Sequence, residues 1–281
     1  MQILIATNGF KGTWPAIEYG AWLGAALRLP VLLLGITEKL NPAQIDDHHP
    51  LEELFSRAVE LFTQNQLEYS LEIQNGTAEP VIVSRAAAGE CITVLGPLGR
   101  PHIRHLIYGR SIHRMIEQIA GPLVYVPNAC LPPKSILICV GGLGYEVTVE
   151  NLGIRLAGLV KARVTLLHVI PPMDLNYPTA REVKKGGTQH LAESNTLPGR
   201  ALRKGLELAQ AAGLQSMLKV REGNIVEEIL KEMSAGGYDL VCMGSPLSTK
   251  ALRQMYAPNV AAEVAEEARC PILVARHRLE K

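Results

Sequence analysis

The chain has 281 residues, 47% of them hydrophobic and 20% charged, which is enough apolar surface for sizeable cores and excludes a disordered chain. The 28 Lys and Arg residues nearly balance 27 Asp and Glu residues, for a formal net charge of +1, so no global field recruits nucleic acid or an anionic membrane. No apolar run reaches the ~18 residues needed to span a bilayer. We therefore expect a soluble globular protein with one large domain or two ordinary ones, and no membrane or nucleic-acid partner.

Short apolar runs alternate with stretches of helical period along residues 1–132. Runs too short for helices and bounded by Gly, Pro or Asn predict buried strands over residues 3–7, 31–37, 69–74, 91–95 and 123–126. Apolar residues at steps of three and four predict amphipathic helices over residues 51–62 and 112–119. Because the strands are apolar on both faces and alternate with helices, they predict a parallel sheet that is covered on both sides.

A Pro-containing linker over residues 127–134 leads into a second copy of the same pattern. Residues 3–6 (ILIA) return as residues 136–139 (ILIC) at an offset of 133, whereas Asn75-Gly76 corresponds to Glu222-Gly223 at an offset of 147. The difference indicates an insertion of about 14 residues, placed in the loop-like stretch at residues 171–197. The sequence thus predicts two tandem five-stranded parallel-sheet α/β sandwiches, residues 1–132 and residues 133–281.

The segment from Gly96 to Ser111 has the composition of a phosphate-binding loop. Its glycines follow the spacing Gly96-x2-Gly99-x9-Gly109 and lead into a predicted helix. Glycines let backbone N–H groups converge on an anion, and a helix N-terminus adds donors and a positive dipole. The surrounding stretch between Glu90 and Glu117 has no acidic residue and contains the arginines Arg100, Arg104, Arg110 and Arg114. The same residues would also suit a turn, a helix cap and a solvated surface, so spacing alone leaves both interpretations open.

The glycine spacing, the ILIATNG run of residues 3–9 and the LLHVI run of residues 166–170 resemble the universal stress protein family in its tandem two-domain form. The resemblance covers nearly the whole chain. It implies strand order 3-2-1-4-5 and pairing of one such domain with another through the last strand. It also implies binding of ATP or AMP, with Mg²⁺ present only as a companion of the nucleotide. Carried over by position, the nucleotide-binding residues would be Ala6, Thr7, Asn8, Ile36, Gly96, Gly99, Arg100, Gly109, Arg110 and Ser111. The glycines and Ser111 would hold phosphate, residues 6–8 would line the nucleoside, and Ile36 would contact the base.

Two positions in the first half depart from the pattern of the family's ATP binders. Those proteins carry an acidic residue at the end of the first strand, where this chain has Asn8. An amide can still hydrogen-bond a ribose or a base, but without assistance from a charge. Arg110 follows the third glycine, where Ser or Thr is expected, and Ser111 comes one residue later.

The second half departs further. Gly141 stands where the acidic residue is expected, and Leu247 stands in place of Gly99. Ala257 or Pro258 stands in place of the third glycine. A Cβ at these turns obstructs close approach of the backbone to an anion. We therefore expect the first half to hold the nucleotide and the second half to be degenerate.

Three histidines, His102, His105 and His113, have the short spacing at which imidazoles can share a zinc ion. No cysteine or carboxylate accompanies them between Cys91 and Glu117, so we assign them to the surface of the loop and expect no metal site.

Signatures of catalysis are weak throughout the sequence. There is no G-x-S-x-G elbow and no G-x4-G-K-[ST] loop, so serine-hydrolase and P-loop mechanisms lack their defining parts. Residues 46–49 (DDHH) precede a helix and suit capping better than acid–base chemistry. His168 closes an apolar strand and is interpreted as a satisfied residue at the end of a sheet.

These features predict a cytoplasmic, non-catalytic stress-response or signalling protein that binds an adenine nucleotide. The five cysteines form no C-x-x-C pair and suit reduced thiols in a cytosolic protein, and the N-terminal residues do not have the features of a signal peptide. Two alternatives stay open: a nucleotide-independent scaffold in which both sites are degenerate, and a slow ATPase. We also expect a protein partner of unknown kind, and a homodimer in addition to the intrachain pair of domains stays open.

Overall fold

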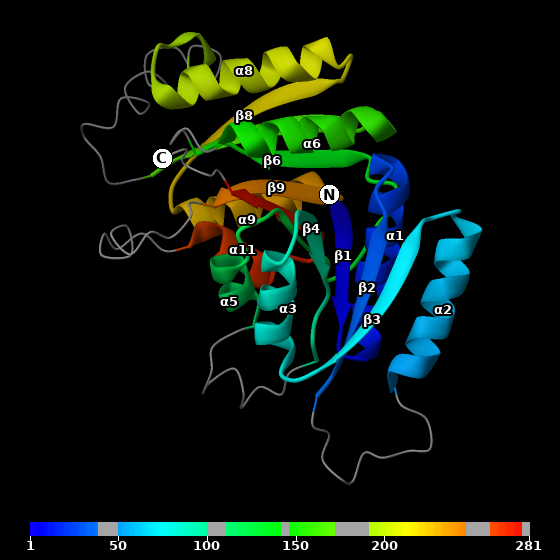
Figure 1. The fold of residues 1–281 in the computed structure, drawn as a ribbon. Helices are drawn as coiled ribbons and strands as arrows, with labels where there is room; N and C mark the ends of the chain where they lie inside the picture. Colours follow the sequence, from blue (N-terminus) through cyan, green and yellow to red (C-terminus); the bar gives the residue numbers. More distant parts are fainter. Residues whose placement is uncertain (39–49, 100–110, 142–145, 172–190, 246–258, 277–281) are drawn as a thin grey trace. The chain divides into compact units, whose positions relative to one another are not determined.

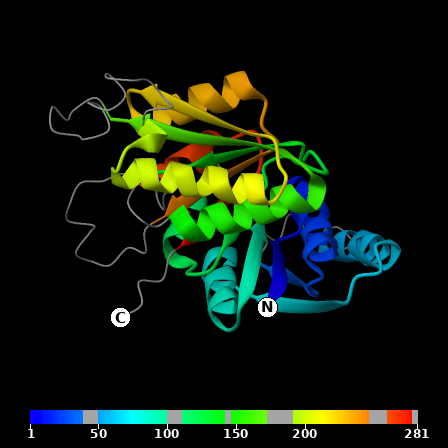
Figure 2. The same ribbon diagram turned by 90° about the horizontal axis from the view of Figure 1, so that it is seen from above.

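A computed structural model of the chain describes residues 1–38, 50–99, 111–141, 146–171, 191–245 and 259–276 (Figures 1 and 2). Contacts divide the chain into two compact units. Unit 1 comprises Met1–Leu131 and Arg269–Pro271, and unit 2 comprises Pro132–Ala268 and Ile272–Lys281. Each unit contains five parallel strands with helices between them.

The strands of unit 1 are β1 (Gln2–Thr7), β2 (Val31–Thr37), β3 (Tyr69–Asn75), β4 (Cys91–Leu95) and β5 (Leu123–Tyr125). They pair in the order β3-β2-β1-β4-β5, with Ile3 of β1 opposite both Val31 of β2 and Ile92 of β4. The intervening helices are the 3-10 turn η1 (Lys11–Thr13), α1 (Trp14–Leu27), α2 (Pro50–Gln64), α3 (Ala78–Ala87) and α5 (Ser111–Gln118). The predicted fold class and strand order are confirmed for the first half.

β3 differs from the prediction that every strand is buried on both faces. It lies at the edge of the sheet, and Tyr69, Leu71 and Ile73 are 37%, 44% and 59% exposed. The residues that alternate with them include Glu72 and Gln74. The prediction was wrong here because an edge strand lies at the margin of the helical layers, where side chains keep contact with solvent.

The strands of unit 2 are β6 (Ser135–Cys139), β7 (Arg163–Ile170), β8 (Ser216–Glu222), β9 (Leu240–Ser245) and β10 (Ile272–Arg276), in the order β8-β7-β6-β9-β10. The helices are α6 (Glu146–Val160), α8 (Leu197–Ala211), α9 (Ile225–Gly236) and α11 (Val260–Glu267). Counted from the start of the unit, the order is again 3-2-1-4-5, as predicted. Within the described ranges, none of the helices combines the length and the apolar character that crossing a bilayer requires.

The centre of unit 1 is built from β1 and α1. Ile3, Leu4 and Ile5 are fully buried, which explains why this strand is almost entirely apolar. A proline in its first turn starts α1, and Arg28 ends it in the left-handed conformation with φ of 55°. Residues 8–13 therefore connect the central strand to a buried helix, and their backbone is held at the carboxyl edge of the sheet.

The two units repeat one detail of the chain path, after their third strands. Gly76 follows β3 with φ of +148° and donates its N–H to the carbonyl of Thr37, at the end of β2. Gly223 follows β8 with φ of +147° and donates to the carbonyl of Ile170, at the end of β7. Such φ values are rare for residues that carry a Cβ, so both turns require glycine. The two glycines are 147 residues apart and their carbonyl partners are 133 residues apart, which are the two offsets of the sequence repeat.

Candidate nucleotide site

The strand order of unit 1 reverses at β1, which has β2 on one side and β4 on the other. Ligands of open parallel sheets bind at such a point, outside the carboxyl ends of the strands. The residues that follow these strands in unit 1 are Asn8 after β1, Glu38 after β2 and Gly96 after β4. This edge is therefore the candidate ligand site of unit 1.

Asn8 joins the ends of three strands. Its Nδ2 donates to Glu38 Oε2 at 3.0 Å and to the carbonyl of Leu98 at 3.1 Å. Its Oδ1 accepts from the backbone N–H of Phe10 at 3.3 Å. A single amide thus ties the loop after β1 to the loops after β2 and β4, which places its side chain at the centre of the candidate site.

Glu38 was not among the predicted site residues. Its Oε2 accepts from Asn8, and its Oε1 accepts from the backbone N–H of Ala78, the first residue of α3, at 2.9 Å. A carboxylate at a helix N-terminus is stabilised by the helix dipole. The acidic group missing from the end of β1 is therefore present at the end of β2. The signal in the sequence was its position directly after the apolar run of residues 31–37.

Thr7 is a buried residue whose hydroxyl holds the loop after β1 through hydrogen bonds. Thr13 Oγ1 donates to the carbonyl of Phe10 at 2.6 Å, so its single proton is used there. Thr7 must then donate in the 2.8 Å contact between the two hydroxyls, while Thr7 Oγ1 accepts from the N–H of Gly9 at 3.1 Å. Both hydroxyls are engaged within the protein, and both side chains are fully buried. Thr7 thus supports the site from the core.

Two other predicted residues also lie in the core. Ala6 and Ile36 are fully buried. Asn8, in contrast, is partly exposed at the carboxyl edge. Of the residues expected to face the nucleoside, the structure brings Asn8 to the surface and keeps Ala6, Thr7 and Ile36 beneath it.

The first two glycines of the spacing motif have close neighbours within the protein. A Cβ built on Gly96 would lie 2.9 Å from the Cα of Thr13. Gly99 has φ of +62°, and a Cβ there would overlap the ring of Phe10, which is itself 43% exposed. Packing alone therefore requires glycine at both positions.

The rest of the predicted phosphate loop lies largely outside the described residues. Arg100, Gly109 and Arg110 fall in the range 100–110. Ser111 is the first residue of α5. The described part of the candidate site therefore consists of the residues predicted to line the nucleoside and the start of the glycine loop.

The corresponding edge of unit 2 has different chemistry. Val140, after β6, accepts a hydrogen bond at 2.7 Å from Nδ1 of His168, which is 1% exposed. A carbonyl can only accept, so Nδ1 carries the proton. His168 is thus buried and engaged within the protein, but β7 continues to Ile170, so His168 lies inside the strand and does not close it as predicted. Leu247, Ala257 and Pro258 lie outside the described residues.

Among the described residues, no group of three or more His, Cys, Asp and Glu side chains is placed to hold an ion. Of the three histidines considered above, only His113 is described, and it lies in α5.

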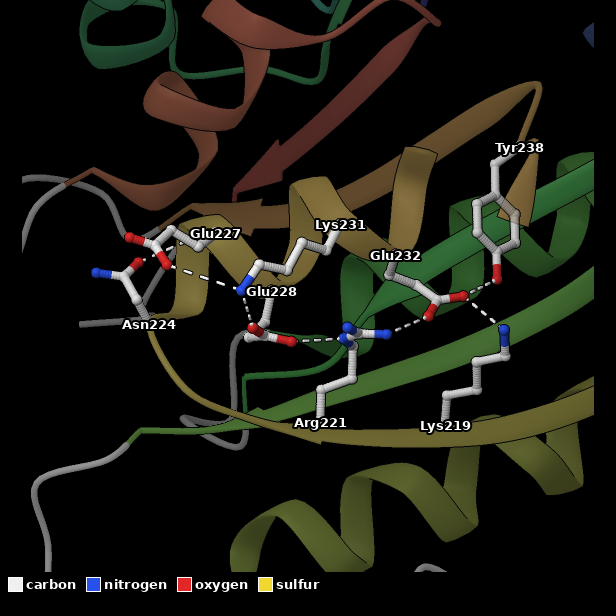
Figure 3. Close-up of polar contacts among 8 residues, drawn as sticks. All are labelled: Lys219, Arg221, Asn224, Glu227, Glu228, Lys231, Glu232 and Tyr238. Carbon is white, nitrogen blue, oxygen red and sulfur yellow. Dashed lines mark hydrogen bonds and ion pairs between the residues drawn. The ribbon is translucent and has the colours of Figure 1, made fainter. Parts of the chain in front are cut away.

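A cluster of charged side chains connects β8 to α9 in unit 2 (Figure 3). We call it the β8–α9 cluster, and its members are Lys219, Arg221, Glu228, Lys231, Glu232 and Tyr238. Glu232 is 3% exposed and accepts from Lys219 at 2.6 Å, from Tyr238 at 2.7 Å and from Arg221 at 3.1 Å. Burial raises the pKa of Glu232, but the hydrogen bonds from Lys219 and Tyr238 outweigh it and hold the pKa below its ordinary value.

The remaining members extend the β8–α9 cluster along α9. Arg221 Nε contacts Glu228 at 2.7 Å, and Lys231 contacts the other oxygen of Glu228 at 2.7 Å. Hydrogen bonds from Lys231 and Arg221 lower the pKa of Glu228. Burial, with the nearby charge of Glu232, raises the pKa of Cys139 to about 12, which keeps this thiol protonated and unreactive at neutral pH. The composition of the sequence did not indicate this cluster, because its members are spread over residues 219–238 and meet only when α9 packs on β8.

Two units that each have five parallel strands in the order 3-2-1-4-5, with a reversal point at the first strand, define a tandem doubly wound α/β protein. The model of the universal stress protein family matches residues 133–276, which is half of the chain, and the chain belongs to this family. The matched segment is the half in which the glycine motif is replaced. A search of curated proteins finds no match.

Solved structures share the fold over nearly the whole chain. A universal stress protein from Archaeoglobus fulgidus DSM 4304 is 12% identical with a TM-score of 0.68, over 100% of this chain and 97% of that one. A functionally unknown protein from Pseudomonas aeruginosa PAO1 is 15% identical with a TM-score of 0.66, over 98% and 92%. A universal stress protein described as putative, from P. aeruginosa UCBPP-PA14, is 15% identical with a TM-score of 0.64, over 98% and 92%. At these identities the likeness establishes the fold.

Proposed function

We propose that unit 1 binds an adenine nucleotide, ATP or AMP, and that the chain acts as a non-catalytic nucleotide-binding protein in a stress response. The observation that carries the proposal is the contact between Asn8 and Glu38 at the reversal point of the sheet. It places an amide and a carboxylate side by side where a nucleoside would lie.

The two side chains suit a nucleoside for different reasons. A carboxylate accepts hydrogen bonds from the two hydroxyls of a ribose, and an amide can both donate to and accept from a base. The phosphates would extend toward Gly99 and the N-terminus of α5, where backbone N–H groups and a positive dipole favour anions. Arg100 and Arg110 would add charge, and any Mg²⁺ would enter with the phosphates.

Binding requires a rearrangement at this site, because Asn8 and Glu38 already satisfy each other. A ribose hydroxyl would take the place of Asn8 at Glu38 Oε2, and Asn8 would turn to the base. The exchange replaces one hydrogen bond by others, so the net gain is modest and weak affinity is expected.

The proposal includes no turnover. A P-loop lysine is missing from the sequence, and both oxygens of Glu38 hold structural hydrogen bonds. A weak ATPase would require Glu38 or a residue of the glycine loop to position water. We further propose a cytoplasmic location, a protein partner that senses the nucleotide, and a homodimer as an optional further assembly.

A nucleotide-independent scaffold is the second candidate. The observation that favours it is the packing of Gly96 against Thr13 and of Gly99 against Phe10. Because packing accounts for both glycines, their presence does not require a phosphate.

Titration calorimetry with ATP, ADP and AMP distinguishes the two candidates. We expect the wild-type protein to bind, and Glu38→Gln to weaken binding about tenfold, since one charge-assisted hydrogen bond contributes on the order of 1.5 kcal/mol. Glu68→Gln, at an exposed position of the same unit, is the control and should bind as wild type does.

The possible results of the calorimetry lead to different conclusions. Absence of binding at millimolar nucleotide favours the scaffold. Binding that Glu38→Gln leaves unchanged would place the nucleotide elsewhere. A mass spectrum of small molecules released from the purified protein would identify the base and the number of phosphates.

A further inference from the structure

The third strand and the helix that follows it pack in the same way in both units. The equivalence at an offset of 147 residues extends from the glycine turn into the helix. A Cβ built on Gly76 would lie 3.0 Å from Val81 in α3, and one built on Gly223 would lie 3.0 Å from Glu228 in α9. Val81 and Glu228 are separated by the same offset, so α3 on β3 and α9 on β8 are equivalent layers.

An ion pair crosses from strand to helix at the same two positions in each unit, but its polarity is reversed. In unit 1, Arg85 Nε of α3 lies 2.9 Å from Glu72 Oε2 of β3. In unit 2, Lys219 Nζ of β8 lies 2.6 Å from Glu232 Oε1 of α9 (Figure 3). Position 72 corresponds to 219 and position 85 to 232 at the offset of 147. The acidic group is on the strand in unit 1 and on the helix in unit 2.

A second position along the same strands strengthens the difference. Arg221 of β8 pairs with Glu228 of α9 at 2.7 Å. Its counterpart on β3 is Gln74, which donates to Glu72, and the counterpart of Glu228 is Val81. The strand of unit 2 thus carries two cations that face a doubly acidic helix, whereas the strand of unit 1 carries an acid that faces one cation.

In each unit the ion pair joins the third strand to the helix that follows it, which is where two related halves could exchange segments. Each unit consists of three strands before the pair's helix and two strands after it. A hybrid could combine the first three strands of one half with the last helices and strands of the other, within one chain or between two chains. Misassembly of this kind is characteristic of chains with repeated domains.

We propose that the reversed polarity of the Glu72–Arg85 and Lys219–Glu232 pairs prevents this exchange. With α9 on β3, Glu232 would face Glu72. With α3 on β8, Arg85 would face Lys219. Both hybrids therefore bring like charges together. The hybrid of α9 with β3 also leaves Glu232 without its cation, and this carboxylate is 3% exposed in the native unit. Each half accepts only its own helix, which is specificity obtained by repulsion of the wrong partner.

The test compares four proteins that differ only in these pairs: wild type, Glu72→Lys with Arg85→Glu, Lys219→Glu with Glu232→Lys, and all four substitutions together. Each is unfolded in guanidinium chloride and refolded by dilution at several protein concentrations. The fraction of native monomer is measured by size-exclusion chromatography and circular dichroism. The urea midpoint of each refolded monomer records local effects on stability, such as loss of the Tyr238 contact with Glu232.

Reversal in one unit keeps an ion pair in each half but gives both halves the same polarity, so we expect the fraction of native monomer to fall by about twofold or more. The decisive comparison is the effect of the Glu72→Lys and Arg85→Glu pair of substitutions in two proteins, the wild type and the protein whose unit 2 ion pair is already reversed. The pair should lower the fraction of native monomer in the wild type. It should raise that fraction in the other protein, because the two units then have opposite polarities again. A local effect on stability would have the same sign in both backgrounds. An equal effect in the two backgrounds, or none in either, overturns the proposal.

Discussion

At Gly99, packing within the protein requires a glycine, and close approach of the backbone to a phosphate would require one too. Its φ of +62° lies in the left-handed region, and the ring of Phe10 fills the space that a side chain would need. Glycine also suits a loop whose backbone approaches an anion. The sequence pattern therefore singles out Gly99 without deciding between the two reasons for a glycine there.

Gly99→Ala should destabilise the protein by about 1–3 kcal/mol, because the new Cβ is strained by the backbone conformation and meets the Phe10 ring. The measurement is the free energy of unfolding in urea. Gly89→Ala is the matched control, since no heavy atom lies within 4 Å of a Cβ built there. Adding Phe10→Ala to Gly99→Ala should recover part of the loss. A Gly99→Ala protein as stable as wild type would contradict the described conformation of this loop.

At the scale of elements, the helices α3 and α9 begin differently although they are equivalent. The Asn224 side chain accepts from the N–H groups of Val226 and Glu227 at the start of α9. Thr77 occupies the same position before α3 but its side chain makes no capping hydrogen bond. The start of α9 is therefore stabilised by its cap, whereas the start of α3 depends on Glu38, which accepts from the N–H of Ala78.

Asn224→Ala should lower stability by about 1 kcal/mol, the usual effect of removing an N-cap side chain. Thr77→Ala is the matched control and should cost less, because no capping bond is lost. Urea unfolding of the two variants provides the comparison. Equal losses of stability in the two variants would show that the capping hydrogen bonds of Asn224 add nothing to the stability of α9.

The β8–α9 cluster predicts a dependence of stability on pH. The pKa of Glu232 in the folded protein lies below the ordinary value of 4.5. Its charged form therefore stabilises the fold above that value, and the contribution is lost as the pH falls through the lowered pKa. We expect the urea midpoint of the wild type to fall on acidification below about pH 4.5.

Glu232→Gln removes this titration. The variant should be less stable than wild type at neutral pH, and the two curves should converge in acid. Glu222→Gln, an exposed substitution next to the same turn, should leave the curve of the wild type unchanged. A constant difference between Glu232→Gln and wild type at every pH would mean that packing, and not charge, carries the effect.

At the scale of the whole molecule, the two halves share one fold but not one chemistry. The family model matches the second half, residues 133–276, whereas the amide–carboxylate contact and the glycine motif belong to the first. The edge of unit 2 instead presents Val140 with its carbonyl bonded to buried His168. The two edges therefore differ, as the proposed division between a binding first half and a supporting second half requires.

This difference predicts the stoichiometry of binding. Calorimetry should find one nucleotide per chain, and substitution of Glu38 should weaken that single event. A substitution at the corresponding edge of unit 2, Gly141→Leu, should have no effect on binding. Two nucleotides per chain, or loss of binding in Gly141→Leu, would assign the site to the second half.

Much of the fold was predictable because it depends on patterns that are local in the sequence. Apolar runs located the strands of unit 1 to within one residue at each end, and the repeat revealed the second sheet. Burial of β3 was overestimated, because the sequence of a strand does not state whether it lies at the centre or at the edge of its sheet.

The site was less predictable, because its contacts join residues that are far apart in the chain. Asn8 could be identified from its place after β1, but its partner Glu38 lies 30 residues away and its third contact, Leu98, lies 90 away.

By itself the sequence determined the fold class, the repeat and the position of the glycine loop, since each is expressed in local periodicity or spacing. Only the tertiary structure decided which carboxylate stands beside Asn8, that Thr7 is engaged in the core, and that equivalent ion pairs have opposite polarity in the two halves. The physical reason is that crossover connections bring separate strand ends to one edge, and strand-to-helix contacts depend on which faces meet.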